Sequence, residues 1–137
     1  MTDARAREKA LSRIAAVQAQ KRRLEEWKLA DFHRRARAVA EAEAQTVAAM
    51  NDGSPLHGLF VAQAGRRLES LARQRRSLEA AIARQGEAVR AEARREKAAE
   101  ALLADAARRA EEERRRRADL EILEAMLARD AGDAGPT

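Results

Sequence analysis

The sequence predicts an all-α protein, an antiparallel two-helix coiled-coil hairpin with a longer C-terminal helix. Three observations support this fold class. Ala, Glu, Lys, Leu and Arg supply 92 of the 137 residues, more than the roughly one half that is typical of coiled coils and long helices. Only 23 residues are Leu, Ile, Val or Phe, too few to fill a globular core. One strong turn signal divides the chain into two stretches of helix-forming residues.

The first helix is expected over residues 3–50, about 70 Å at 1.5 Å per residue. Large apolar residues shift phase upstream of residue 29, which predicts a stutter, with Trp27 at the edge of the interhelical seam. The upstream stripe consists of Leu11, Ile14, Val17 and Leu24. Downstream, a 3-4 spacing typical of a coiled-coil seam links Leu29, Phe32, Ala36, Val39, Glu43, Thr46 and Met50.

The turn is expected over residues 51–55, where Asn, Asp, Gly, Ser and Pro follow one another. Ser54 fits the N-cap and Pro55 the first position of a second helix over residues 55–129, about 110 Å long. Its seam repeats at the same spacing through Leu68, Leu71, Arg75, Leu78, Ile82, Gln85 and Val89. Residues 1–130 should therefore form a single hairpin, followed by a disordered tail over 131–137.

The second helix is too long for the first to cover. Counting back from the turn leaves residues 104–129 as an overhang. Four acid-first i,i+4 pairs support it as a single helix, namely Asp105–Arg109, Glu111–Arg115, Glu112–Arg116 and Glu113–Arg117. An apolar cluster follows them, Leu120, Ile122, Leu123, Met126 and Leu127. The cluster is either a binding surface or a stripe that is buried by a bend or by self-association.

The sequence does not predict an enzyme. It has no cysteine, and His33 and His57 are too far apart along the hairpin to share a metal ion. No nucleophile, phosphate-loop or zinc motif is present, so no cofactor and no metal are expected. The four arginines at 114–117 follow three glutamates and few aromatic residues accompany them, which argues against specific recognition of nucleic acid. Weak, salt-sensitive binding of polyanions remains an alternative.

A small, basic, cysteine-free helical hairpin of this size resembles the FliJ/YscO family of type III export stalk proteins. Three parts of the chain carry the resemblance. The first is residues 11–17 with the basic run after them, the second is the turn in mid-chain, and the third is the helix from Lys97 to Leu103 that leads into Arg/Glu repeats. The resemblance implies a non-enzymatic stalk of a flagellar or injectisome export apparatus. Such a stalk couples a hexameric export ATPase to the export gate and, in some members, escorts chaperones.

The resemblance also implies which residues meet partners. The helix termini would contact the ATPase, through Leu120, Leu123, Met126, Leu127, Arg115, Arg116, Leu11 and Ile14. The turn would face the gate, through Asp52, Leu56 and Phe60. Because the sequence shows neither a secretory signal pattern nor a transmembrane segment, a cytoplasmic location is expected. The resemblance implies that this location is peripheral to the inner-membrane export apparatus. A monomer is expected, and a dimer remains an alternative.

Two competing functions stay open. One is a generic cytoplasmic coiled-coil scaffold or adaptor, which would dimerise through residues 104–129. The other is a weak polyanion-binding helical protein, whose binding would fall steeply with salt. The sequence does not separate a flagellar from an injectisome system, name substrates or chaperones, or assign a helix face to each partner.

Overall fold

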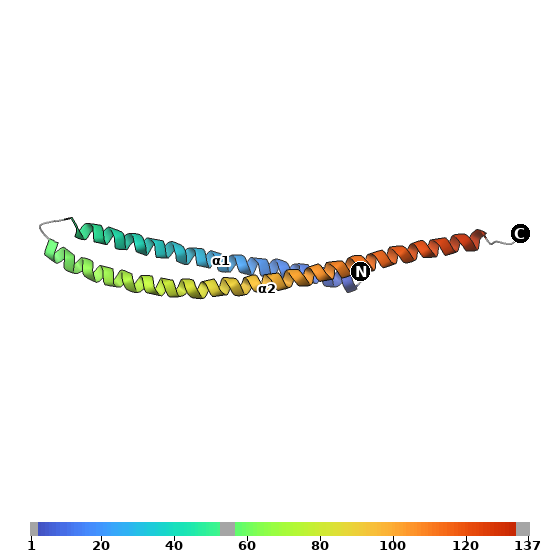
Figure 1. The fold of residues 1–137 in the computed structure, drawn as a ribbon, viewed down its shortest axis with the longest axis horizontal. Coiled ribbons are helices and arrows are strands. Elements are labelled where there is room, and N and C mark those ends of the chain that lie inside the picture. The colour runs from blue at the N-terminus through green and yellow to red at the C-terminus, as the bar shows by residue number, and fades with distance from the viewer. Residues whose placement is uncertain (1–2, 53–56, 134–137) are drawn as a thin grey trace. The chain divides into compact units, whose positions relative to one another are not determined.

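The structure, a computed structural model, describes residues 3–52 and 57–133 and consists of two long α-helices (Figure 1). Helix α1 spans Asp3–Met50 and contains 48 residues, and helix α2 spans His57–Asp133 and contains 77. The described residues form no β-strand. The all-α class and the longer second helix agree with the sequence prediction.

The end of α2 lies later than expected. The helix continues past Arg129 and includes Gly132, so residues 131–133 are helical rather than part of a tail. Glycine costs up to about 1 kcal/mol in a helix interior but is well tolerated in a last turn. The expected helix start at Pro55 lies outside the described residues.

Packing divides the chain into two compact units, and both helices contribute to each of them. Unit 1 contains the described residues 3–19 and 95–133, and unit 2 contains 20–52 and 57–94. The prediction of one hairpin did not anticipate this division.

In unit 2 the two helices pack antiparallel. Thr46 and Ala64 line one groove near the turn, whereas Glu25 and Gln85, both far from the turn, are joined by hydrogen bonds. Positions at the predicted 3-4 spacing are covered on both helices, except Arg75 on α2, which is exposed. On α1 the covered positions are Arg22, Glu25, Leu29, Phe32, Ala36, Val39, Glu43, Thr46 and Met50. On α2 the covered positions are Val61, Ala64, Leu68, Leu71, Leu78, Ile82, Gln85 and Val89.

The core of unit 2 is a narrow seam. Its buried side chains are Val39, Thr46, Ala64 and Leu71, and a fully buried Val or Leu contributes about 2 kcal/mol. Thr46 is tolerated there because its hydroxyl donates a 2.7 Å hydrogen bond to the carbonyl oxygen of Ala42.

Polar side chains connect the two helices at two points of this seam. Arg75 reaches across from α2, and its Nη1 lies 2.8 Å from Oε2 of Glu43. Gln85 Nε2 donates to the backbone oxygen of Glu25 at 2.9 Å and also to its carboxylate. The sequence identified Arg75 and Gln85 as polar interruptions of the seam, and the structure supplies their partners.

Unit 1 packs mainly through alanine. Ala99 and Ala106 are its most buried residues, at 6% and 2% exposure. Facing positions on α1 are half-buried, namely Glu8, Leu11, Ala15 and Gln18. Small side chains let two helices approach closely but remove little apolar surface from water.

The predicted stutter in α1 is wrong. Ile14, Val17 and Leu24 are each more than half exposed, and Trp27 is 64% exposed rather than held at the edge of the seam. The covered positions keep a single 3-4 spacing instead. The sequence reading followed the largest apolar side chains, whereas the positions that pack hold alanine, glutamine and glutamate.

The uncovered part of α2 begins later than residue 104. Ala106 is buried, and Ala110 and Glu113 are half-buried. The prediction counted residues symmetrically from the turn, but interhelical register depends on which side chains interlock. Every residue from Arg114 to Asp133 is exposed.

Candidate partner-binding surfaces

Ion pairs along one helix support α2 where it leaves the helix pair of unit 1. Arg109 Nε lies 3.3 Å from Asp105 Oδ2, Arg115 Nε lies 3.5 Å from Glu111 Oε1, and Arg117 Nη2 lies 3.1 Å from Glu113 Oε1. Three of the four predicted i,i+4 pairs therefore form, and the fourth, Glu112–Arg116, does not. Each such pair adds only about 0.2–0.5 kcal/mol to an isolated helix, but together they favour a helical conformation without a packing partner.

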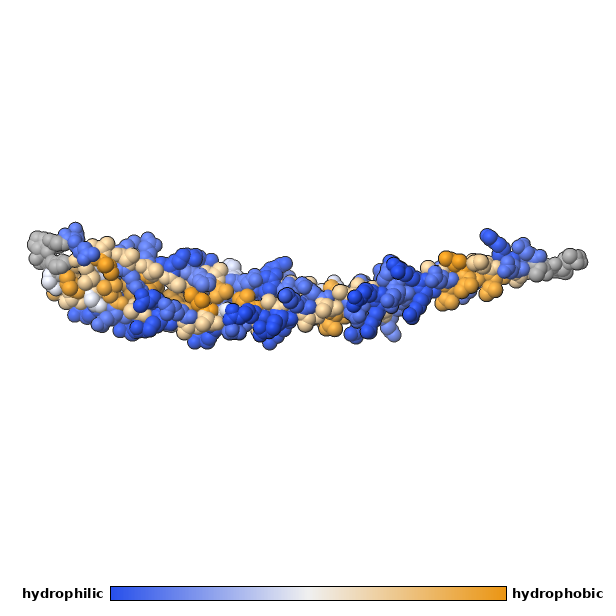
Figure 2. All heavy atoms as spheres, viewed as in Figure 1, coloured by the Kyte–Doolittle hydropathy of each residue, from blue (hydrophilic) through white to orange (hydrophobic). Residues whose placement is uncertain are grey.

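Beyond these pairs lies the C-terminal cluster, which we define as the five large apolar residues of the uncovered part of α2. Figure 2 shows it as a hydrophobic patch that follows a strongly hydrophilic stretch. Residues spaced three and four apart share a helix face, so the cluster forms one continuous stripe. Its members are between 53% and 65% exposed: Leu120, Ile122, Leu123, Met126 and Leu127.

Charged residues flank the C-terminal cluster on both sides. Arg115 and Arg116 precede it, and Asp130 and Asp133 follow it, all of them exposed. Arg115 pairs with Glu111. In the part of the chain that the structure describes, neither Arg116 nor Asp130 has an ion pair.

The two predicted N-terminal contact residues differ in their surroundings. Leu11 is half-buried in the seam of unit 1, whereas Ile14 is 53% exposed. Within unit 1, the described start of α1 lies beside α2 before the segment that carries the C-terminal cluster (Figure 1). The structure therefore does not join Leu11 and Ile14 with that cluster into one surface.

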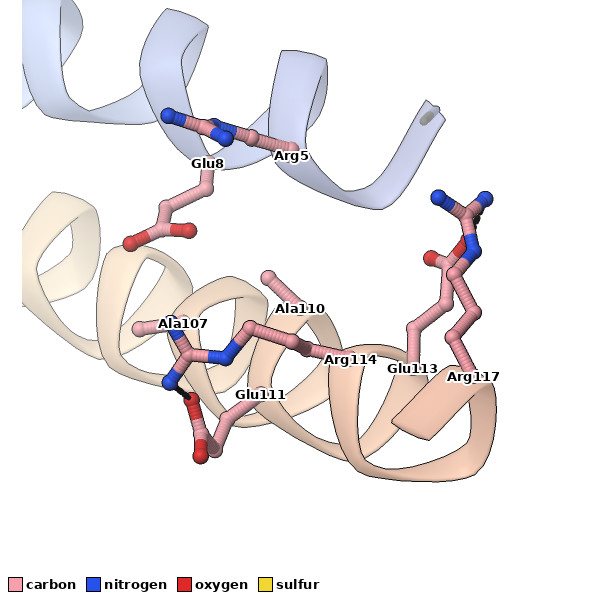
Figure 3. A pocket seen from close by; sticks show the side chains of 8 residues that line it. All are labelled: Arg5, Glu8, Ala107, Ala110, Glu111, Glu113, Arg114 and Arg117. Atoms are coloured by element: carbon pink, nitrogen blue, oxygen red, sulfur yellow. Dashed lines mark hydrogen bonds and ion pairs between the residues drawn. The ribbon is translucent and has the colours of Figure 1, made fainter. Parts of the chain in front are cut away.

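A polar groove lies where the first turns of α1 meet α2 in unit 1 (Figure 3). It is lined by Arg5, Glu8, Ala107, Ala110, Glu111, Glu113, Arg114 and Arg117. Arg114 is paired with Glu111, and Arg117 with Glu113. Because acidic and basic side chains alternate around it, the groove does not present a field of one sign to a charged ligand.

A second exposed surface lies near the turn of unit 2. Asp52 is exposed, and its backbone N–H donates a 3.3 Å hydrogen bond to Ala49 O at the end of α1. Phe60 is 39% exposed and lines a shallow groove with Thr46 and other residues of the two helices. Leu56, the third residue predicted for this surface, lies outside the described residues.

Sequence reasoning missed two apolar side chains at this end of unit 2. Leu59 is 68% exposed and Val47 is 47% exposed. For Leu59 the signal was present in the short apolar run from Leu59 to Ala62. Its position just after the turn, outside the seam spacing, could have identified Leu59 as exposed.

Two carboxyl groups have perturbed acidities. Hydrogen bonds from Gln85 and then Lys28 lower the pKa of Glu25 below its ordinary value of 4.5. A hydrogen bond from Arg90 and the charge of Arg90 lower the pKa of the exposed Glu87. In both cases the hydrogen bonds and nearby positive charges stabilise the charged carboxylate, and the pKa falls as a result. Such shifts are typical of structural ion pairs and hydrogen bonds.

No converging set of ligands or acid–base groups lies within residues 3–52 and 57–133. These residues contain no group of three His, Asp or Glu side chains placed to hold a metal ion. Neither α1 nor α2, over its described length, contains a stretch apolar enough to cross a membrane. Most of the large apolar side chains that are exposed lie in the C-terminal cluster, in the surface near the turn, and on α1 at positions that include Ile14, Leu24 and Trp27.

Comparison with known proteins does not extend these observations. No family model, no curated protein and no solved structure matches the chain.

Proposed function

We propose that this protein is a non-enzymatic coiled-coil stalk of a type III export apparatus, flagellar or injectisome. It would couple a hexameric export ATPase to the export gate and escort export chaperones, in the cytoplasm beside the inner membrane. As part of this proposal, the two helices form an antiparallel coiled-coil hairpin. The covered positions at 3-4 spacing on both helices of unit 2 support it.

The observation that carries the proposal is the exposed C-terminal cluster. A stalk needs a stiff body and an end that engages its partner. Paired helices supply stiffness, and α2 presents Leu120, Leu123 and Met126 on a segment that no other described residue covers. An exposed apolar helix face is the surface by which an amphipathic helix enters a groove of a partner protein.

The surface near the turn supports a second contact. Leu59 and Phe60 are apolar and exposed there, beside the exposed Asp52. In the proposed stalk this surface faces the export gate, and the C-terminal cluster contacts the ATPase.

The test uses the full chain and the hexameric export ATPase of the same cell. We expect the chain to copurify with the ATPase and to stimulate ATP hydrolysis. The double substitution Leu123→Asp with Met126→Asp should abolish both effects, because charged side chains on this face cannot enter an apolar groove. Leu59→Asp, at the turn surface, is the matched control and should leave ATPase stimulation unchanged.

Two results would refute the proposal. One is the absence of both binding and stimulation with the wild-type chain, and the other is equal loss with Leu59→Asp and with the cluster variant. A scaffold would instead bind other proteins without any effect on an ATPase. A polyanion binder would retain nucleic acid or heparin at low salt and lose it steeply as salt rises.

A further inference from the structure

The uncovered part of α2 is long for a helix without a partner. Residues 114–133 are exposed without interruption and extend over about 30 Å. Isolated helices of this length are marginal in water, and packing of an amphipathic face supplies most helical stability. A helix with five exposed large apolar side chains is therefore expected to be covered by a partner.

Charge is ordered along this segment. The basic run at 114–117 comes first. The C-terminal cluster follows, with Asp119 just before it and Glu121 and Glu124 between its apolar residues, and Arg129, Asp130 and Asp133 come last. A single helix face with a basic residue at one end, an apolar centre and an acidic residue at the other end is complementary to itself when a second copy runs in the opposite direction.

The spacing places this complementarity on one face. Arg116, Leu120, Leu123, Leu127 and Asp130 follow one another at alternating intervals of four and three residues, so they share a helix face. Arg116 and Asp130 lie one heptad before and one heptad after Leu123. Both are exposed and lack ion-pair partners among the described residues.

We propose that the C-terminal cluster binds the same cluster of a second copy of this chain, in an antiparallel helix pair centred near Leu123. Each copy's Arg116 then faces Asp130 of the partner copy, and the apolar side chains cover one another. A two-fold contact of this kind closes on itself, so the product is a dimer and not a filament.

A parallel pair is disfavoured by the same charges. It would set Arg116 against Arg116 and Asp130 against Asp130, and like charges placed opposite each other are repulsive. In the antiparallel pair, each Arg116 lies opposite an Asp130 instead, so both contacts are attractive.

The contact involves only one helix face from each copy, so the dimer is weak and exchanges readily. The inference goes beyond the proposed function, since it involves no ATPase, and it replaces the monomer expected from the sequence with the dimer that was the alternative. A partner that binds the C-terminal cluster would compete with the second copy.

The experiment measures the mass of the purified full chain by sedimentation equilibrium over a dilution series. We expect the mass to rise from monomer to dimer with concentration. Arg116→Asp and Asp130→Arg should each weaken dimerisation roughly tenfold, since each reversal affects two ion pairs of the dimer. The double variant with both reversals should regain the wild-type dimerisation constant, because the antiparallel pairs are restored with the charges exchanged.

Two controls accompany these variants. Leu123→Asp should abolish the dimer, and circular dichroism would report whether the helices persist. Arg84→Asp reverses an exposed charge in unit 2 and should leave the mass unchanged. The proposal is overturned by a monomer at every concentration, by a dimer that survives Leu123→Asp, or by a double variant that stays as weak as the single ones. None of these outcomes depends on the ATPase assay.

Discussion

Gln85 connects the two helices of unit 2 at a position that matches the apolar spacing of the seam. Its side-chain amide donates to the backbone oxygen of Glu25 and to the carboxylate of the same residue. Glu25 also accepts a 3.2 Å hydrogen bond from Lys28. These donors favour the charged carboxylate and lower the pKa of Glu25 below 4.5.

The pH dependence of stability should therefore contain a contribution from this contact. A carboxyl group whose pKa is lower in the folded state contributes stability that is fully present above its unfolded pKa and is lost as pH falls through the folded pKa. The wild-type chain should lose thermal stability between neutral pH and about pH 3, and Gln85→Leu should lose less over the same range. Thermal unfolding followed by circular dichroism measures the difference.

The exposed Gln74 offers a matched control. Gln74→Leu removes an amide of the same kind without touching Glu25, so its pH profile should follow that of the wild type. Identical profiles for Gln85→Leu and the wild type would contradict the role assigned to this hydrogen bond.

Side-chain pairing was only partly accessible from the sequence. The 3-4 spacing predicted that Arg75 and Gln85 face the partner helix, and the structure places both at the interhelical contact. That Glu43 and Glu25 are their partners depends on the register between the two helices. The spacing of residues along a single helix does not determine this register. Arg116 was likewise assigned to Glu112, but a surface pair contributes too little to fix two long side chains.

At the scale of the element, α2 continues through two internal glycines without a break. A Cβ added to Gly65 would meet nothing within 4 Å. No neighbouring atom approaches Gly65 closely enough to exclude a side chain, and its backbone does not have a conformation that only glycine adopts easily. The glycine there weakens the helix by its conformational freedom alone.

Replacing Gly65 with alanine should stabilise the protein. The helix propensity difference predicts an increase of about 0.5–1 kcal/mol in the free energy of unfolding. Urea titration followed by circular dichroism measures it. Gly132→Ala is the control in the last turn of α2, where an added Cβ also meets nothing and where the expected gain is close to zero. A loss of stability with Gly65→Ala would contradict the prediction.

The bounds of α1 and the seam positions of unit 2 were the part of the fold that the sequence predicted best, since turn residues and apolar spacing act locally. The stutter and the start of the uncovered segment were predicted wrongly. Both depend on close helix packing, in which Ala99 and Ala106 are the most buried residues of unit 1. A reading guided by large apolar side chains such as Ile14 and Val17 overlooks alanine as a packing residue.

For the whole molecule, the two units differ in what they bury. Unit 2 covers Val39 and Leu71 and has two polar links between its helices. It also half-buries Leu29, Leu68, Leu78 and Ile82. Among the described residues of unit 1, the buried ones are Ala99 and Ala106. Since stabilisation grows with the apolar area that is buried, unit 1 should be the weaker of the two.

Hydrogen exchange under native conditions should reveal this difference. Regions with the least buried apolar surface open locally at the lowest free energy. Amides in residues 3–19 and 95–113 should therefore exchange faster than those in 29–50 and 61–89. Exchange measured by mass spectrometry on the wild-type chain at low concentration, where it is monomeric, avoids protection by a second copy. The substitution Ala106→Gly should speed exchange in unit 1 while leaving the 29–50 region unchanged. Equal protection in the two units would contradict the prediction. It would mean that close packing of alanine stabilises a helix pair as well as the larger side chains of unit 2 do.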